Sequence, residues 1–179
     1  MDFQQLTRLQ RLMADTRGAL HARFRSLPHG ARIGQHNMPR RAEYAFGGDH
    51  ALQCWYRDTT LRWVRFEDYS HDRTIPLTAI VEYQPGYTPA MVIVEPAAMR
   101  TLLTGASQLR TGDLRAAEQS FAAVEREQAD PNARVLLGTA IGMRGGCRMG
   151  LGDTVTAIAE SRRALASIAI GCVLFFGNR

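Results

Sequence analysis

The chain has 179 residues, of which 45% are hydrophobic, and a formal net charge of +5. A chain of this length and apolar content can bury a core, which excludes a wholly disordered protein. Its three cysteines, Cys54, Cys147 and Cys172, lie far apart and form no C-x-x-C pair, so their spacing excludes a disulfide framework and a zinc knuckle.

All 22 basic residues are arginine, and they are distributed unevenly along the chain. Residues 8–41 hold eight arginines and one acid, whereas residues 42–96 hold four arginines and eight acids. Such asymmetry is typical of an electrostatic contact surface. It also fits a basic N-terminal segment, residues 8–41, that packs on the acidic segment 42–96. The lack of lysine fits a GC-rich bacterial genome, or a protein exposed to lysine-directed tagging.

The first predicted element is a helix over residues 3–24. Its apolar residues recur at alternating three- and four-residue steps, which is the spacing of one helical stripe. The stripe consists of Leu6, Leu9, Met13, Thr16, Leu20 and Phe24. Arginines off the stripe predict a basic surface, formed by Arg8, Arg11, Arg17, Arg23 and Arg25. Residues 28–39, which begin and end with proline, then predict an irregular connection.

From Ala42 to Glu95 the pattern changes to short runs rich in aromatic and β-branched residues. Turn-forming residues such as Gly47-Gly48-Asp49 separate the runs, which favours close antiparallel pairing. The predicted strands lie in residues 42–46, 51–57, 61–69, 78–83 and 90–95. We expect a small antiparallel β-meander, with one face covered by the N-terminal helix.

After Pro96 the strand pattern ends and four helices are predicted. They cover Met99–Arg110, Leu114–Gln128, Asn132–Met149 and Thr154–Phe176. Because the connections are short, consecutive helices are expected to pack as antiparallel neighbours. The sequence therefore predicts an α+β fold with two domains, a helix-plus-sheet domain over residues 1–96 and a helical segment over residues 97–179.

The helical segment contains an internal correspondence. The stretch GDLRAAEQSFAAV aligns with GDTVTAIAESRRAL when Gly112 is placed on Gly152, which follows it by 40 residues. Ala117 then falls on Ala157, and each copy follows another predicted helix. The segment therefore reads as two helix–turn–helix units.

This pattern resembles the tetratricopeptide-repeat (TPR) family, whose unit is about 34 residues long. Gly112, Leu114, Ala117 and Phe121 fit the second helix of that repeat, and Gly105 fits the small residue of its first helix. Small residues let paired helices approach closely, and Phe121 is expected to fill the gap to the next unit. The alternative is a plain four-helix packing whose turns coincide by chance.

The resemblance implies a binding face. In TPR proteins the first helix of each unit lines a concave surface that recognises another protein, which nominates Gln108, Arg144 and Arg148 here. The arginines suit acidic groups on a partner. Two units are fewer than the roughly three that an independent array needs. The sheet domain, a second subunit or a partner is therefore expected to cover the exposed repeat surface.

The last predicted helix is apolar on all sides from Ala164 to Gly177. Such a helix is buried on several sides or lies in a membrane. The 14 residues span ~21 Å as a helix, less than the ~30 Å hydrocarbon core, so spanning is disfavoured and shallow membrane contact is the weaker alternative. Four residues are expected to dock against the sheet domain or to form a homodimer with a second copy: Leu165, Ile168, Cys172 and Phe175.

No pattern predicts catalysis or a cofactor. The five histidines show no metal-ligand spacing, so no metal is expected. Cys54 lies near His50 and Asp49, but a cysteine in an apolar predicted strand is more typical of a buried, unreactive thiol. We therefore expect that the protein is not an enzyme.

Two functions remain. The first is a non-catalytic protein–protein interaction module, which as an adaptor, assembly subunit or secretion-chaperone-like protein binds a protein or peptide through the helical segment. The alternative is nucleic-acid binding, in which the N-terminal arginines meet phosphates and aromatic residues on the sheet stack on bases. The aromatic candidates are Tyr44, Trp55, Tyr56 and Trp63. The N-terminus lacks a secretory pattern, so a cytoplasmic location, or export without a recognisable signal peptide, is expected.

Overall fold

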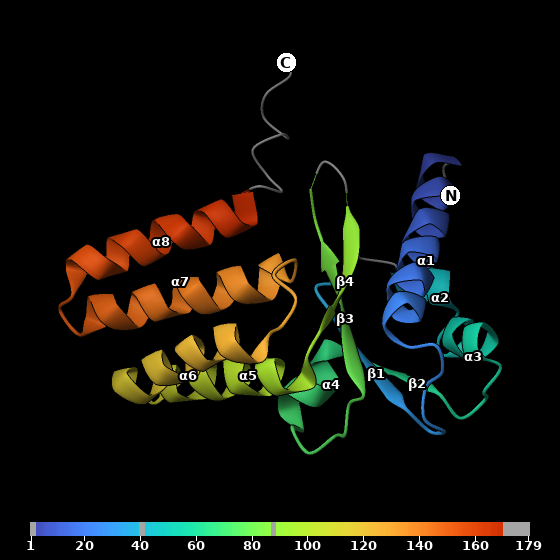
Figure 1. Cartoon of the computed structure of the whole chain (residues 1–179), viewed down its shortest axis with the longest axis horizontal. Helices are drawn as coiled ribbons and strands as arrows, with labels where there is room; N and C mark the ends of the chain where they lie inside the picture. The colour runs from blue at the N-terminus through green and yellow to red at the C-terminus, as the bar shows by residue number, and fades with distance from the viewer. Residues whose placement is uncertain (1–2, 40–41, 87–88, 170–179) are drawn as a thin grey trace. The chain divides into compact units, whose positions relative to one another are not determined.

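A computed structural model describes residues 3–39, 42–86 and 89–169 (Figure 1). The predicted α+β class is confirmed, because these residues form eight helices and one four-stranded sheet, and the C-terminal half is helical. The chain divides into two compact units, which we call the sheet unit (residues 1–83 and 90–93) and the helical unit (residues 84–89 and 94–179). The predicted domain division near Pro96 stays a prediction.

In the sheet unit, α1 (Phe3–Arg23) packs on the sheet through part of the predicted stripe and through Leu12, which lies outside that stripe, whereas Leu6 of the stripe is 45% exposed. Leu12, Thr16 and Leu20 are buried at four-residue steps, and Thr16 Oγ1 donates to the Leu12 carbonyl at 2.7 Å. Leu12 and Leu20 share one core cluster with Ile33 of the sheet. Burying one such aliphatic side chain contributes ~1.5–3 kcal/mol, so Leu12 and Leu20 anchor the helix.

The sheet is mixed, which corrects the predicted antiparallel meander. Its strands are β1 (Arg32–His36), β2 (Arg62–Val64), β3 (Ala79–Gln84) and β4 (Ala90–Val94), in the order β2-β1-β3-β4. β1 runs parallel to both neighbours. Its partners in β2 advance from Arg62 to Val64 as β1 advances from Arg32 to Gly34, and its partners in β3 begin at Ala79, opposite Ile33. β4 pairs with the other side of β3.

The pairing differs from the prediction because helices lie between the strands. These helices are α2 (Ala42–Phe46), α3 (His50–Tyr56) and α4 (Phe66–His71). The first two replace predicted strands, and the third replaces the end of another. In α2 Ala42 and Phe46 are buried while Tyr44 between them is 78% exposed, which fits a helix, because a strand would place all three side chains on one face. Connections that contain helices carry the chain back across the sheet, so β1, β2 and β3 run in the same direction.

β1 lies in the segment predicted to be an irregular connection. Its five residues hold one β-branched side chain, Ile33, so the strand pattern is weak. Gly34 is required by packing, because a β-carbon there would lie 2.9 Å from Ile80 Cγ1 and 3.2 Å from Tyr69 Cε1. The strand is therefore set by its neighbours more than by its own sequence.

The helical unit contains the four helices that the sequence predicts. They are α5 (Pro96–Arg110), α6 (Leu114–Glu127), α7 (Arg134–Gly150) and α8 (Thr154–Ala169). Consecutive helices pack against each other, and α7 lies between α6 and α8 (Figure 1). Residues 170–176, which the prediction included in the last helix, lie outside the described residues.

The α5–α6 and α7–α8 turns have the same backbone structure 40 residues apart. The Gly112 amide donates to the Leu109 carbonyl at 3.1 Å, and the Gly152 amide donates to the Met149 carbonyl at 3.1 Å. Both glycines have left-handed φ angles, of 81° and 88°, which glycine adopts without a steric penalty. The correspondence in sequence is therefore also one of local structure.

The two helices that follow these turns begin in the same way. Asp113 Oδ1 accepts a hydrogen bond from the Ala116 amide at 3.2 Å, and Asp153 Oδ1 accepts one from the Thr156 amide at 3.1 Å. Each aspartate thus satisfies an amide that has no partner within the first turn of its helix. α6 and α8 are therefore equivalent second helices of two hairpins.

Candidate interaction face of the helical unit

In both hairpins of the helical unit, a buried glycine on the first helix lets the second helix approach closely. In the first hairpin the ring of Phe121 packs over Gly105, where a β-carbon would lie 2.7 Å from ring atom Cε1. In the second, a β-carbon at Gly145 would lie 3.2 Å from the Ala157 carbonyl oxygen and 3.4 Å from Ser161 Oγ. Phe121 thus fills space within its own hairpin, whereas in the second hairpin the glycine meets the backbone of α8.

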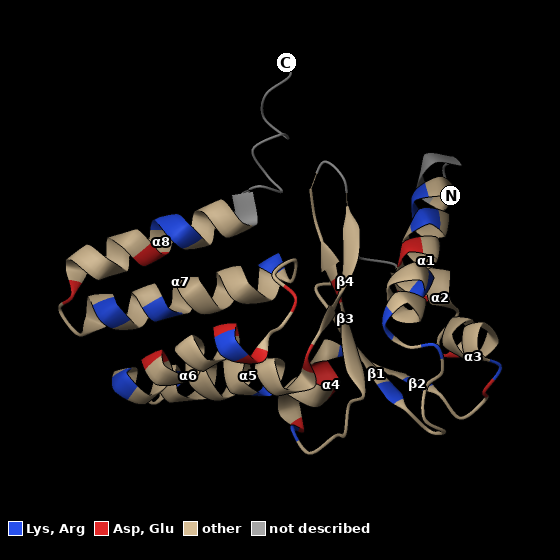
Figure 2. Ribbon diagram, viewed as in Figure 1, with Lys and Arg blue, Asp and Glu red and all other residues tan. Residues whose placement is uncertain are grey.

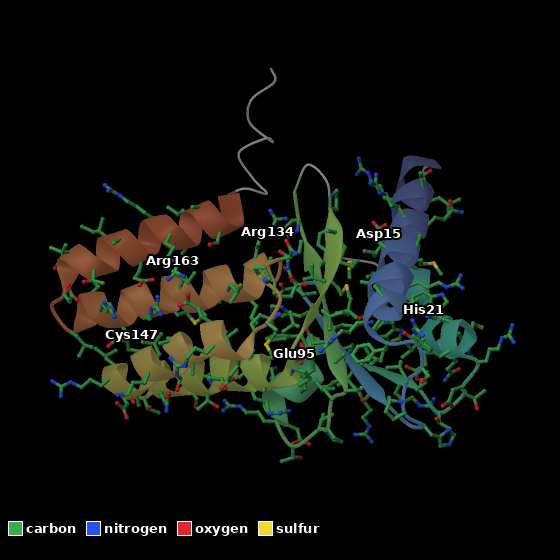
Figure 3. The ribbon with its side chains drawn as sticks, in the orientation of Figure 1. Asp15, His21, Glu95, Arg134, Cys147 and Arg163 are labelled. Atoms are coloured by element: carbon green, nitrogen blue, oxygen red, sulfur yellow. The ribbon has the colours of Figure 1, made fainter. Side chains whose placement is uncertain are left out.

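An ion-pair network ties α6, α7 and α8 together. At its centre, Arg144 of α7 contacts Glu125 of α6 at 2.6 Å and both carboxylate oxygens of Glu160 of α8, at 2.7 and 2.8 Å. Arg163 of α8, labelled in Figure 3, also contacts Glu125, and a second nitrogen lies 3.9 Å from Glu160. The four side chains form a closed ring that joins three helices.

The Arg144 guanidinium is held in its charged form. Its side chain is 11% exposed, and this burial alone would lower its pKa. The hydrogen bond to Glu160 and the charge of Glu125 outweigh the burial, so the pKa of Arg144 is raised. Arg144 Nη2 contacts both carboxylate oxygens of Glu160 and its Nη1 contacts Glu125, and together these contacts fix the orientation of the side chain as well as its charge.

Arg148, one turn further along α7, links the same helices. Its Nε lies 2.8 Å from Glu118 Oε1 of α6, and its Nη1 lies 3.8 Å from Asp153 Oδ2 at the start of α8. Arg144 and Arg148, both nominated as partner-binding residues, therefore have carboxylate partners within the chain. Their role toward another protein stays a prediction, while these contacts give them a role in holding the hairpins together.

The third nominated residue, Gln108 of α5, also faces its own hairpin. Its side-chain oxygen accepts a hydrogen bond from the Ser120 hydroxyl of α6 at 2.7 Å. The residue is half-buried. The sequence pattern placed Gln108 on the first helix, but it carries no signal for this contact with the second.

The outward-facing side of α8 is apolar and exposed. Val155, Ile158 and Leu165 are 83%, 46% and 66% exposed. At about 100° per residue, they and the exposed Arg162 lie within an arc of roughly 80° around the helix axis. Arg162 has no ion pair in the described part of the chain. We call these four residues the α8 outer face. Single exposed aliphatic residues are ordinary, but three within one arc make this side of the helix mainly apolar.

The internal repeat shows what the α8 outer face corresponds to in the first hairpin. The positions 40 residues before Ile158 and Leu165 are Glu118 and Glu125 of α6. Those glutamates are the α6 side chains that contact the two arginines of α7. The α8 outer face is therefore the counterpart of the face on which α6 receives the next helix.

The N-terminal arginines predicted to form a basic surface are exposed, and they face several directions. They are Arg8, Arg11, Arg17, Arg23 and Arg25. Arg11 and Arg17 are six residues apart, which on a helix places them roughly 120° from each other. Figure 2 shows the basic bands spread along α1 around an acidic one, and Arg11 lies 3.8 Å from Asp15. These arginines do not form one stripe.

Three of the four aromatic residues suggested for base stacking are packed in the sheet unit. Trp55 and Trp63 meet edge to face with their ring centroids 6.4 Å apart. Tyr56 stacks on His21 at 4.6 Å. Tyr44 is 78% exposed. Trp55 and Tyr56 lie on α3 and Tyr44 on α2, which corrects their assignment to strands.

The residues predicted to dock near the end of the chain are described in part. Leu165 is exposed on α8. The side chain of Ile168 and the whole of Cys172 and Phe175 lie outside the described residues. Docking against the sheet domain or a second copy stays a prediction.

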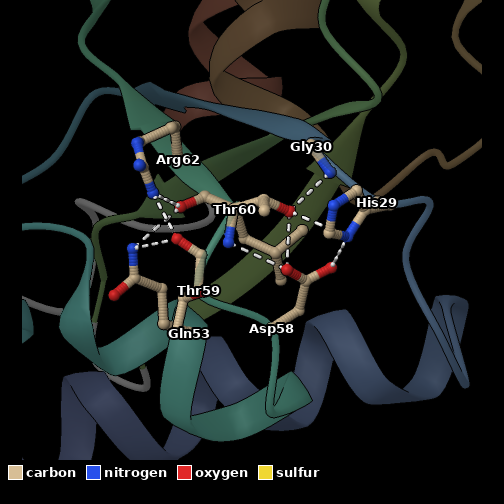
Figure 4. A network of polar contacts seen from close by, with 8 residues as sticks. His29, Gly30, Gln53, Asp58, Thr59, Thr60 and Arg62 are labelled. Atoms are coloured by element: carbon tan, nitrogen blue, oxygen red, sulfur yellow. Dashed lines mark hydrogen bonds and ion pairs between the residues drawn. The ribbon is translucent and has the colours of Figure 1, made fainter.

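A polar network joins two loops of the sheet unit (Figure 4). Asp58 Oδ1 accepts hydrogen bonds from the Thr60 hydroxyl at 2.5 Å and the Thr60 amide at 2.8 Å, and Asp58 Oδ2 lies 3.1 Å from His29 Nδ1. Thr60 Oγ1 lies 3.2 Å from the same ring nitrogen and accepts from the Gly30 amide at 2.7 Å. In a catalytic triad the nucleophile and the acid bind opposite nitrogens of the histidine. The arrangement therefore closes loops and is not a triad.

A buried acid–histidine pair lies at the carboxyl ends of β1 and β3. His36 Nδ1 is 2.6 Å from Glu82 Oε2, and the Glu82 side chain is fully buried. From α4, Phe66 lies 5.2 Å from the His36 ring, and the Tyr69 hydroxyl donates to the Gln35 carbonyl at 3.0 Å. Burial, and then the charge of Glu82, raises the pKa of Tyr69. Residues of α4 thus pack around the pair, which ties two strands together.

The two described cysteines differ in exposure. Cys54 lies on α3 and is exposed, which corrects the predicted buried strand thiol: the run is helical, and its core-facing residues are Ala51 and Leu52. Cys147 on α7 is buried (Figure 3). Its burial, and then the charge of Glu118, raises the pKa of the thiol, so it is protonated at neutral pH.

Comparisons with models of protein families, with curated proteins and with solved structures find no match to this chain. Among the described residues, no three His, Cys, Asp or Glu side chains gather closely enough to hold a metal ion. No helix within the described ranges has both the length and the apolar character of a membrane span. The α8 outer face is the feature on which a functional proposal rests.

Proposed function

We propose that this chain is a non-catalytic protein–protein interaction module, whose TPR-like helical unit binds a helix of another protein on the α8 outer face. The observation that carries the proposal is the correspondence between α6 and α8. The face that receives α7 in the first hairpin recurs in the second with aliphatic side chains that are exposed. A helix laid on Ile158 and Leu165 would continue the packing that α7 begins on α6.

The apolar side chains of this face contribute to binding but do not set the affinity by themselves. Burying a Val, Ile or Leu side chain contributes ~1.5–3 kcal/mol, so three contribute at most about 5–9 kcal/mol. The loss of translational and rotational freedom on association is of similar size. Contacts around the three residues therefore decide the affinity, as suits an adaptor or assembly subunit that binds reversibly.

A capture experiment with matched variants tests this proposal. The immobilised chain is compared with Ile158→Glu, which places a charge in the α8 outer face, and with Gln119→Glu, which makes the same charge change at an exposed position of α6. We expect cell extract to supply a protein that the unaltered chain and Gln119→Glu retain and that Ile158→Glu loses. Nuclease treatment should leave the capture unchanged.

Two results would count against the proposal. Capture that Ile158→Glu leaves unchanged contradicts a role of the α8 outer face. Retention of nucleic acid that weakens steeply with salt, and with replacement of Arg11 and Arg17, supports the nucleic-acid alternative instead.

A further inference from the structure

We infer that the partner helix runs antiparallel to α8, contacts it through an apolar face, and carries a carboxylate opposite Arg162. This inference rests on the proposed function and adds the direction and chemistry of the partner. It follows from three features of the helical unit, which concern direction, apolar contact and charge.

The α6–α7 contact gives the direction. Glu118 near the start of α6 contacts Arg148 near the end of α7. Glu125, seven residues later in α6, contacts Arg144, four residues earlier in α7. Because the order is reversed, the two helices are antiparallel. A helix that docks on α8 in the same way has its first turn at the C-terminal end of α8 and its last turn at the N-terminal end.

The side chains of α8 give the apolar character. Where α6 offers two carboxylates to arginines of the next helix, α8 offers Ile158 and Leu165. A partner arginine at these positions would lose its hydration without gaining a counter-charge, which is unfavourable. The partner is therefore expected to present aliphatic or aromatic residues at helical spacing, as amphipathic helices do when they bind along an apolar face.

Arg162 gives the charge. It lies between Ile158 and Leu165 on the α8 outer face and is exposed. Its neighbour Arg163 differs, because the Arg163 guanidinium is held by Glu125. An apolar helix laid across the face would cover the stem of Arg162 and partly desolvate its charged end. A carboxylate at that point restores the lost interaction, and it discriminates between partners.

A second copy of the chain meets this requirement poorly. An α8–α8 contact would bring two Arg162 side chains into one apolar interface. The acidic residue nearest in sequence, Glu160, is 13% exposed and already bound by Arg144. Charge complementarity therefore favours a helix of a different protein over a homodimer through this face.

Two synthetic helical peptides that differ at one position provide the test. Each has roughly 18 residues, about five helical turns, with leucines along one face. One peptide has glutamate and the other lysine at the centre of that face. Each is titrated into the full chain and followed by fluorescence anisotropy. We expect the glutamate peptide to bind about tenfold more tightly, which corresponds to about 1.4 kcal/mol.

Charge reversal in the chain completes the experiment. Arg162→Glu should reverse the preference between the peptides, and Arg126→Glu, at an exposed position of α6, should leave it unchanged. Both substitutions are at exposed sites, and a thermal scan confirms that the variants are folded. Ile158→Glu should abolish binding of both peptides.

The outcomes separate this inference from the proposed function. Equal affinity for both peptides overturns the inference. It is also overturned if neither peptide binds while the capture experiment still yields a protein that Ile158→Glu loses. In both cases the proposed function stands. A dimer in sedimentation that Ile158→Glu dissociates also overturns it, because a second copy then occupies the face. If peptides and capture both fail, the proposed function fails with it.

Discussion

The α6 face that receives α7 and the α8 outer face occupy equivalent places in two hairpins with the same turns, but their side chains differ in kind. On α6 two glutamates contact two arginines of α7. On α8 the equivalent residues are Ile158 and Leu165, 46% and 66% exposed. The backbone is repeated, and the difference lies in the side chains.

This contrast separates an internal contact from an external one. Ion pairs with defined geometry fix the angle and register of α7 on α6, and a partly buried pair tolerates few alternatives. An aliphatic face is less selective in geometry and supplies affinity in proportion to the apolar area it buries. One charge, Arg162, is then left to discriminate between partners. The experiments below test each side of the contrast, from the largest expected effect to the smallest.

The largest effect is expected from Arg144→Ala. This change removes the buried counter-charge that Glu125 and Glu160 share and leaves them only the half-exposed Arg163, which should lower the free energy of unfolding by about 3 kcal/mol. Urea denaturation followed by circular dichroism measures it, and Arg126→Ala at an exposed α6 position is the control. A loss below about 0.5 kcal/mol, the size of an ordinary surface change, would show that the network does not hold the hairpins together.

A smaller decrease in the free energy of unfolding is expected from Gly105→Ala. Its β-carbon would lie 2.7 Å from the buried Phe121 ring, and such overpacking costs ~1–3 kcal/mol. Gly146→Ala on α7 is the matched control, because nothing lies within 4 Å of a β-carbon there. That control should stabilise the chain by ~0.5–1 kcal/mol through helix propensity. If both variants are stabilised, the close packing of Phe121 on Gly105 is contradicted.

Acid should weaken the start of α8. Hydrogen bonds from the Thr156 side chain and backbone lower the pKa of Asp153 from its usual 3.8. A group whose pKa is lowered on folding stabilises the fold above its unfolded value, and this contribution is lost as pH falls through the folded pKa. Asp153→Ser keeps a capping oxygen that does not titrate. Its thermal midpoint should therefore fall less than that of the unaltered chain as pH is lowered from about 5 to about 2. Parallel curves for the two proteins would exclude this role.

The smallest effect on stability is expected from Ile158→Glu. The side chain is 46% exposed and lies on the α8 outer face. The free energy of unfolding should therefore change by no more than about 0.5 kcal/mol. Thermal and urea unfolding of the full chain measure it. A loss of several kcal/mol would mean that the chain itself buries this face, which would then not be open to a partner.

Features fixed by local periodicity were predictable from the sequence. The α1 stripe places Leu20 within a helix that packs on the sheet, and Gly112 and Gly152 mark two turns with the same hydrogen bonds. Both signals depend only on residues a few positions apart. The four C-terminal helices follow from the same kind of local evidence.

Features set by tertiary contacts were not predictable in this way. Aromatic residues near Trp55 suggested a strand, but the segment forms a helix in the connection between two parallel strands. β1 depends on neighbours that crowd Gly34. The candidate site shows the same limit: Arg144 was nominated from its helix position, but its acidic partners come from two other helices. The apolar residues of α8 were visible in the sequence, whereas their shared exposure on one arc required the structure.

The orientation of a bound helix on α8 tests the central claim most directly. The glutamate peptide, with a paramagnetic label at either end, is added to isotope-labelled chain, and amide signals are recorded by NMR. With the label at the peptide N-terminus, we expect broadening around Leu165; with the label at its C-terminus, we expect broadening around Val155. The reverse order, or broadening confined to α1 while α8 is unaffected, would contradict the claim that α8 receives a partner helix as α6 receives α7.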